Sequence, residues 1–163
     1  MVRVGVGYDS HRFDEARPLT LGGIEIPGEP GLAGHSDADA ICHAITDAVL
    51  GAAGLGDIGA LFPDDDPAHE GADSVRLLAD AVHHVREAGY TVGNVDVTVV
   101  AEHPRMAPLV PRMTGRLAPA LGVDEGRISI KGKSNEGMGW IGRGEGIAAI
   151  AVATVVAIDR PPG

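Results

Sequence analysis

The order of hydrophobic and polar positions along the chain predicts a mixture of strands and helices. The run VRVGVGY near the start is typical of a short buried strand that ends where polar residues begin. Residues 19–26, LTLGGIEI, predict a small β-hairpin whose turn holds two adjacent glycines. Further strands are predicted at 91–101, 127–131 and 146–158. The last strand is apolar on both faces and needs a cover on each side, which favours a subunit interface.

Helical spacing of the remaining apolar residues predicts three helices. Ser36 or Asp37 can cap the first, which runs to about Ala53. The second runs over residues 73–88 and stops at a glycine, and the third covers 106–121, where three prolines disturb its ends. Strands mixed with three helices predict an α+β fold, with a mixed sheet covered on one face by helices. At 163 residues the chain is expected to form one domain, residues 1–163.

Composition narrows the classes of function. The chain has only two Phe, two Tyr and one Trp, so its core must be aliphatic. It carries 23 acidic and 13 basic residues, a formal charge of -10, which argues against nucleic acid or an anionic membrane as a partner. A phosphorylated substrate would therefore need metal ions and a few local cations for its neutralisation.

Cysteine use and hydropathy predict the compartment. Cys42 is the only cysteine, which excludes an internal disulfide and a four-cysteine zinc site and fits a reducing environment. No signal-peptide region is evident, and the longest apolar run, 146–158, has 13 residues. A membrane helix needs roughly 20. We therefore expect a soluble, cytoplasmic protein with no membrane partner.

A metal site is predicted from two separate segments. Asp9 and His11 follow the first strand, and because strand side chains alternate, one cation can contact both. His43 can supply a third ligand from the first helix, where Asp39 and Asp47 lie on the same face and one of them can orient its second ring nitrogen. This set suits Zn²⁺ with a fourth position open for substrate oxygen. The alternative is a turn-capping aspartate, a surface histidine and a solvated acidic helix face.

Two segments favour phosphate binding. His35 and Ser36 lie at or just before the first helix, where free N–H groups attract anions, although capping by Ser36 explains the same residues. Residues 131–146, KGKSNEGMGWIGRGEG, combine six glycines with cationic side chains, and Glu136 among them can hold Mg²⁺. A glycine-rich hairpin is the alternative there. A P-loop is excluded, because the spacing of its glycines is one residue too long and no helix follows.

Taken together, GYDSHRF, GHSDADAICHAITDAVLGAAGLGDIGALFPDDDP, GADS, NVDVTVVAEHPRM and GRGEGIA resemble the 2-C-methyl-D-erythritol 2,4-cyclodiphosphate synthase family, in order and with matching spacing. The resemblance covers almost the whole chain. It implies a metal-dependent phosphorus–oxygen lyase of the non-mevalonate isoprenoid pathway, which converts 4-diphosphocytidyl-2-C-methyl-D-erythritol 2-phosphate to the cyclic diphosphate and CMP. It also implies a homotrimer whose sheets face each other around a threefold axis, with active sites between subunits.

The resemblance assigns a role to individual residues. Asp9, His11 and His43 match the ligands of one Zn²⁺ per subunit. Glu136 matches a second site, for Mg²⁺ or Mn²⁺ bound with the substrate, while His35 and Ser134 match positions credited with stabilising the transition state. The positions matched to contacts with the cytidine diphosphate substrate are Ser10, Ser36, Asp57, Ile58, Gly59, Phe62, Pro63, Asp64, Asp65, Asp66, Ala101, Glu102, His103, Pro104, Arg105, Met106, Ala107, Lys133, Asn135, Trp140 and Arg143.

Some positions depart from the family pattern. Residues 133–135, Lys-Ser-Asn, stand where threonines are common, Arg105 where lysine is frequent and Trp140 where phenylalanine is usual. Arginine and lysine present different geometry to a phosphate, so the individual contacts are left open. Two other functions use the same residues: a metal-dependent phosphohydrolase that activates water, and a non-catalytic trimer that binds a nucleotide or isoprenoid diphosphate.

Overall fold

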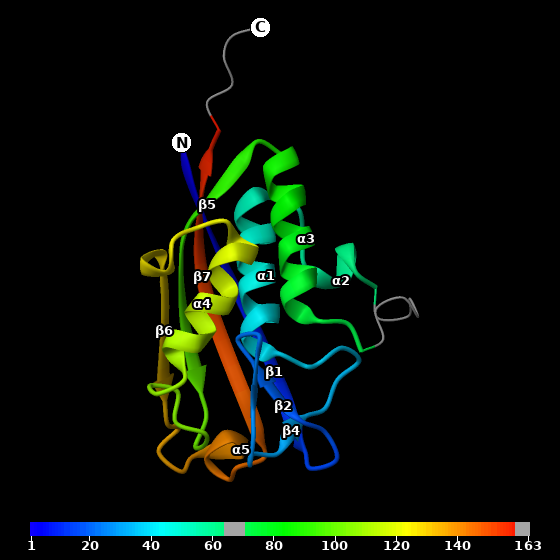
Figure 1. Cartoon of the computed structure of the whole chain (residues 1–163), viewed down its shortest axis with the longest axis vertical. Coiled ribbons are helices and arrows are strands. Elements are labelled where there is room, and N and C mark those ends of the chain that lie inside the picture. Colours follow the sequence, from blue (N-terminus) through cyan, green and yellow to red (C-terminus); the bar gives the residue numbers. More distant parts are fainter. Residues whose placement is uncertain (64–70, 159–163) are drawn as a thin grey trace, which may run out of the picture.

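The chain forms one main sheet covered on one side by helices. The computed structural model describes residues 1–63 and 71–158. Its five-stranded sheet has the order β4-β1-β7-β5-β6 (Figure 1). The strands are β1 (Val2–Asp14), β4 (Gly31–Leu32), β5 (Tyr90–Val100), β6 (Ile128–Lys133) and β7 (Gly146–Ala157). Only β5 and β6 pair in parallel, so the sheet is mixed.

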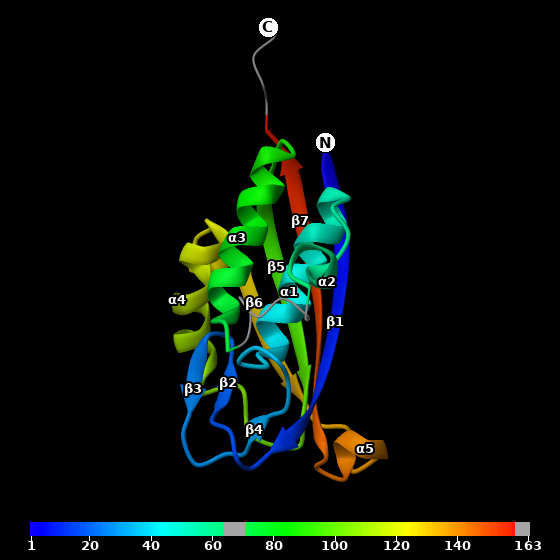
Figure 2. The same cartoon turned by 90° about the vertical axis from the view of Figure 1, so that its right-hand side faces the viewer.

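Helices α1 (Ala40–Ala53), α3 (Ser74–Glu87) and α4 (Val110–Leu121) lie on one side of this sheet (Figure 2). α1 packs directly on β1 and β7, and α3 lies between α1 and α4. The short elements are the hairpin of β2 (Leu19–Leu21) and β3 (Ile24–Ile26), α2 (Ile58–Leu61), the 3₁₀ turn η2 (Glu125–Arg127) and α5 (Gly139–Gly142). The predicted α+β fold, with helices on one face of a mixed sheet, is confirmed. None of the described helices is long and apolar enough to cross a bilayer.

Strand β1 differs from its prediction. It extends to Asp14, and its valines are not buried: Val2, Val4 and Val6 are 63%, 65% and 67% exposed. The buried positions are Gly5 and Gly7, on the face that α1 covers. The helix lies so close that a Cβ on Gly7 would stand 1.9 Å from the carbonyl oxygen of Ala44. The hydrophobic pattern predicted the strand correctly, but the close approach of a helix reversed which face is buried.

The first and third helices begin later than predicted. Asp39 caps α1: its carboxylate accepts hydrogen bonds from the backbone N–H groups of Ile41 and Cys42, so neither Ser36 nor Asp37 is the cap. α4 begins at Val110 rather than at residue 106, with a proline in its first turn, where the missing N–H costs nothing. By contrast α3, capped by Asp73, the β2–β3 hairpin and β5 lie within one residue of their predicted ranges.

One face of the sheet has no cover within the described chain. The buried side of β7 faces α1, whereas Ile150, Val152 and Val156 on its other side are 41%, 39% and 37% exposed. They adjoin β1, whose exposed valines continue the same surface, since β1 and β7 pair along their length. The predicted double burial of the last strand is therefore met on only one side within a single chain.

Candidate functional site

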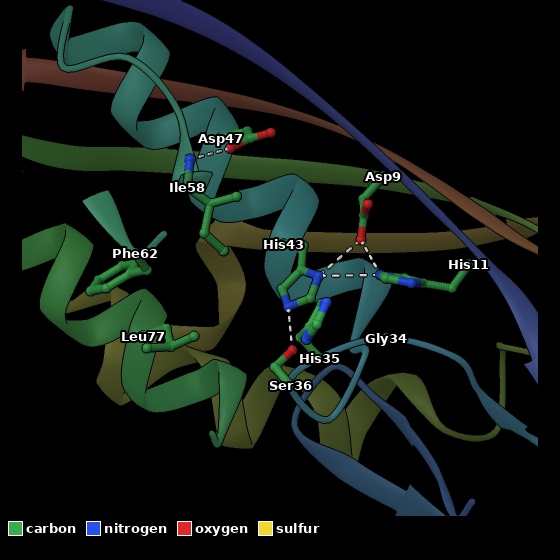
Figure 3. A pocket seen from close by; sticks show the side chains of 10 residues that line it. All are labelled: Asp9, His11, Gly34, His35, Ser36, His43, Asp47, Ile58, Phe62 and Leu77. Carbon is green, nitrogen blue, oxygen red and sulfur yellow. Dashed lines mark hydrogen bonds and ion pairs between the residues drawn. The ribbon is translucent and has the colours of Figure 1, made fainter. Parts of the chain in front are cut away.

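Asp9, His11 and His43 come together where β1 passes α1. Asp9 Oδ2 lies 2.7 Å from His11 Nε2 and 2.9 Å from His43 Nδ1, and the two histidine nitrogens are 3.3 Å apart (Figure 3). All three side chains are partly buried, and their candidate ligand atoms lie within 4.8 Å of one another. Within the described residues no other group of three His, Cys, Asp or Glu side chains meets this criterion. The arrangement is suited to gripping one cation from three sides.

Strand alternation and one backbone contact orient His11. Asp9 and His11 project from the same face of β1, as the spacing predicted. His11 Nδ1 lies 2.7 Å from the carbonyl oxygen of Ala33, which can only accept a hydrogen bond. Nδ1 therefore directs its proton toward Ala33, which leaves Nε2 as the ring nitrogen that faces Asp9 and could coordinate a cation in place of its hydrogen bond.

Two serines orient His43, and among the residues that the structure describes no carboxylate contacts its Nε2. His43 Nε2 lies 2.9 Å from Ser74 Oγ and 3.1 Å from Ser36 Oγ. Ser74 in turn donates its hydroxyl proton to Asp37, so it accepts from the Nε2–H of His43. Nδ1, which contacts Asp9, is then the ring nitrogen that could coordinate a cation. The prediction that Asp39 or Asp47 orients this nitrogen is wrong, since both accept hydrogen bonds from backbone N–H groups. Asp37 acts in their place, through Ser74.

The electrostatics of the cluster favour a charged Asp9. Burial raises the pKa of this carboxyl, but hydrogen bonds and attraction from His11 and His43 outweigh it and bring the pKa to about 2. Burial lowers the pKa of His43, while its hydrogen bond with Asp9 and nearby carboxylates raise it, for a net increase. A cation bound at the cluster would attract the Asp9 carboxylate in place of the histidine protons.

Asp39, which caps α1, and Asp47 within it do not form a solvated acidic face. Asp39 is fully buried and also accepts hydrogen bonds from the N–H groups of Gly22 and Gly23, which ties the β2–β3 turn to the helix start. Burial raises its pKa. Asp47 accepts from the N–H of Ile58 at 2.8 Å and borders the site, and burial raises its pKa as well. The prediction that the N–H groups of the helix start bind an anion is wrong, because Asp39 accepts from those of Ile41 and Cys42. His35 and Ser36 themselves line the cavity beside the cluster.

A cavity of about 230 Å³ opens beside the cluster. Figure 3 shows Asp9 and His11 at one end and the apolar side chains of Ile58, Phe62 and Leu77 at the other. The remaining lining residues are Gly34, His35, Ser36, His43 and Asp47. The lining joins a polar end, which holds the three candidate ligands, to an apolar end. Asp57 instead caps α2, Gly59 and Pro63 lie outside the lining, and Asp64, Asp65 and Asp66 fall outside the described residues.

A second cavity, of about 570 Å³, lies between the end of β6 and the turn after β5. Of the predicted substrate residues it is lined by Ala101, Glu102, Pro104, Arg105, Met106, Ala107, Lys133 and Ser134. Asn135 borders it through its backbone N–H, which donates to Glu102 at 2.8 Å. His103 is absent from the lining and contacts Glu29 instead. One chain thus holds the two halves of the predicted site in separate cavities.

The remaining predicted residues lie around the glycine-rich segment. Glu136 is exposed and accepts a hydrogen bond from Ser134 Oγ at 3.0 Å, apart from the Asp9–His11–His43 cluster. Ser10 and Trp140 share a shallow third hollow with His11, and Arg143 pairs with Glu145 at 2.7 Å. The predicted hairpin alternative fails for this segment, which forms the end of β6, the turn of α5 and the start of β7.

Comparisons with known proteins match this architecture along its whole length. The YgbB family matches residues 2–156. A 2-C-methyl-D-erythritol 2,4-cyclodiphosphate synthase from Gemmatimonas aurantiaca is 58% identical over 158 residues, covering 97% of this chain and 95% of that protein. The chain belongs to the YgbB family. The resemblance drawn from the motifs is confirmed.

Solved structures of related proteins have the same fold as this chain. IspF from Plasmodium falciparum, in complex with CDP, matches with a TM-score of 0.84 at 35% identity over 97% of each chain. The bifunctional IspDF from Campylobacter jejuni matches with a TM-score of 0.93 at 42% identity, covering 98% of this chain and 43% of that one. The present chain therefore spans less than half of the bifunctional protein.

Three residues of this YgbB site were missed by sequence reasoning. Ser74 orients His43 from the start of α3, 31 residues further along the chain. Arg17 donates hydrogen bonds from its guanidinium to the carbonyl oxygens of Gly34 and Ser36, which holds this loop beside the Asp9–His11–His43 cluster. Leu77 supplies part of the apolar end of the cavity and reads in the sequence as an ordinary core position of α3. The segment GADS was part of the motif evidence, but no local pattern indicates which side chain Ser74 contacts.

Proposed function

We propose that the chain is a metal-dependent 2-C-methyl-D-erythritol 2,4-cyclodiphosphate synthase of the non-mevalonate pathway, a phosphorus–oxygen lyase. The observation that carries the proposal is the Asp9–His11–His43 cluster at the polar end of a small cavity, in a chain 58% identical to a synthase of this name. In the reaction, an oxygen of the substrate's 2-phosphate bonds to the β-phosphorus, the bond from that phosphorus to the α-phosphate oxygen breaks, and CMP leaves. Water is not consumed.

The donor set fits Zn²⁺ at the cluster. One carboxylate and two imidazoles, each with one ring nitrogen facing the cluster, make three ligands, and the adjoining cavity leaves a side open. Glu136, an exposed single carboxylate, fits Mg²⁺ or Mn²⁺, which use one or two carboxylates together with substrate phosphates. When bound, these cations supply the positive charge that aligns the diphosphate and offsets the charge of departing CMP.

The chain's own residues would position the substrate. The apolar end of the first cavity fits the methylerythritol carbons, and Asp57, Gly59 and Pro63, which flank its lining residues Ile58 and Phe62 in the chain, are proposed as further contacts. The second cavity, which Arg105 and Lys133 help to line, fits the cytidine diphosphate. His35 borders the first cavity and Ser134 the second, and each can donate a hydrogen bond to a phosphate oxygen that gains charge in the transition state. No protein nucleophile is required, because the substrate carries its own.

We also propose that the chain acts as a homotrimer with active sites between subunits. Two observations support it. The two cavities are separate within one chain, so a substrate that needs both must bind where neighbouring chains meet. The sheet face formed by β1 and β7 presents valine and isoleucine without a cover in the described chain, and three such faces around an axis would cover one another.

Isotope labelling separates this function from hydrolysis. Purified protein with Zn²⁺ and Mg²⁺ is incubated with the substrate in ¹⁸O-labelled water, and the products are examined by mass spectrometry. Cyclisation releases CMP and leaves every phosphate unlabelled. A label in a phosphate product would instead establish a phosphohydrolase, and no release of CMP would favour a binding protein without catalytic activity.

A further inference from the structure

His103 was expected to contact the substrate, but its side chain points away from the nucleotide cavity. Its two neighbours in the chain, Glu102 and Pro104, both line that cavity, whereas His103 does not. His103 Nδ1 lies 2.9 Å from Glu29 Oε2, and a carboxylate oxygen accepts, so Nδ1 carries the proton. The same ring stacks on Phe13 with centroids 4.9 Å apart and planes 5° from parallel.

These contacts join three segments that are distant in sequence. Phe13 lies near the end of β1, on the same face as His11, and Glu29 belongs to the loop that follows β3. The turn after β5 and the end of β1 both lie at the lower end of the molecule in Figure 1. We use the term latch for the set of Phe13, Glu29 and His103. The turn is also tied to the end of β6 and the residues after it: Ala101 N–H donates to the carbonyl oxygen of Lys133, and the N–H of Asn135 donates to Glu102.

We infer that His103 is a positioning residue, which holds residues 101–107 in the shape that receives the cytidine diphosphate. The inference rests on the proposed function, since it takes the second cavity as the nucleotide site. One wall of that cavity is made by strand residues of β5 and β6, whereas the other is the turn 101–107, which is neither helix nor strand. The shape of this second wall therefore depends on the contacts that hold the turn from behind. The latch holds residues 101–107 in place without contacting the nucleotide itself. It also fixes the turn to the strand that carries Asp9 and His11.

If the latch acts in this way, its loss should weaken nucleotide binding and leave zinc binding unchanged. Without it, residues 101–107 sample other conformations, and binding must first select the competent one. Ordering a turn affects ground state and transition state alike, so KM rises and kcat is nearly constant. Zinc content is unchanged, because Asp9, His11 and His43 keep their own hydrogen bonds.

The test measures CDP binding by calorimetry, zinc by elemental analysis, and KM and kcat for the substrate. His103→Ala should raise both the Kd for CDP and KM about tenfold, from loss of one stacking contact and one charge-assisted hydrogen bond, with kcat within about twofold. His103→Phe keeps the stacking and should give an intermediate Kd. Glu29→Gln keeps an acceptor for Nδ1–H and should bind CDP nearly as the unaltered protein does.

The matched control is His83→Ala. His83 is an exposed histidine on α3 that pairs with Glu87 at 3.4 Å and lines none of the three cavities described, so its removal should leave Kd, KM and kcat unchanged. Equal CDP affinity in His103→Ala and the unaltered protein would overturn the latch, as would a loss of zinc together with CDP binding. A failure of the unaltered, zinc-loaded protein to bind CDP would instead remove the proposed nucleotide site itself.

Discussion

Replacing Gly7 by alanine tests whether the close contact of β1 and α1 builds the metal centre. A Cβ at position 7 would stand 1.9 Å from Ala44 O and 2.8 Å from Ala48 N, whereas ordinary contact begins at 3.4 Å. Both opposing atoms belong to the helix backbone and cannot turn aside. The helix must therefore withdraw from the strand by more than an ångström at this point.

The withdrawal has two consequences. Overpacking against rigid backbone should lower the free energy of unfolding by about 3 kcal/mol, the upper part of the usual range. His43 precedes Ala44 and moves away from β1 with it. In the unaltered protein its Nδ1 lies 2.9 Å from Asp9 Oδ2, and the withdrawal lengthens this distance. Since ligand distances must hold to within about 0.2 Å, we expect zinc affinity to fall about tenfold or more.

The assay combines urea unfolding of the metal-free protein, followed by circular dichroism at fixed protein concentration, with competitive zinc titration. Gly51→Ala is the matched control, because Gly51 lies in α1 and nothing stands within 4 Å of its Cβ position. This variant should gain about 0.5–1 kcal/mol from helix propensity and keep its zinc affinity. Unaltered stability and zinc affinity in Gly7→Ala would refute the reasoning.

Three further predictions concern the same site and the sheet. Ser74→Ala should lower zinc affinity about 10- to 100-fold by removing the group that sets the His43 tautomer, measured by zinc titration; an unchanged affinity would contradict that role. In metal-free protein, Asp9 with its pKa near 2 stabilises the fold above its usual pKa of 3.8, so the stability difference from Asp9→Asn should shrink as pH falls from about 4 to 2 in urea unfolding. Val6→Asp should yield monomers by light scattering, since Val6 lies on the proposed trimer face; persistent trimers would exclude that face.

Much of the local structure could be predicted because it depends on neighbours in the chain. The two glycines at the tip of the β2–β3 hairpin adopt positive φ, as such a turn requires. Helix α3 follows its apolar stripe from the Asp73 cap to the glycine after it. Alternation along β1 placed Asp9 and His11 on one face, and the order of the motifs led to the family without any coordinates.

Only the tertiary structure decided how these elements meet. The pattern VRVGVGY marked its valines for burial, but α1 packs on the glycines because only a residue without Cβ allows that approach, and the valines face outward. Asp39, expected on a polar helix face, is buried because it satisfies N–H groups of both α1 and the hairpin turn. Ser74 and His103 acquire their partners across 31 and 74 residues, through contacts that no local periodicity encodes. Sequence determined which residues can do the chemistry, whereas packing determined which of them reach one another.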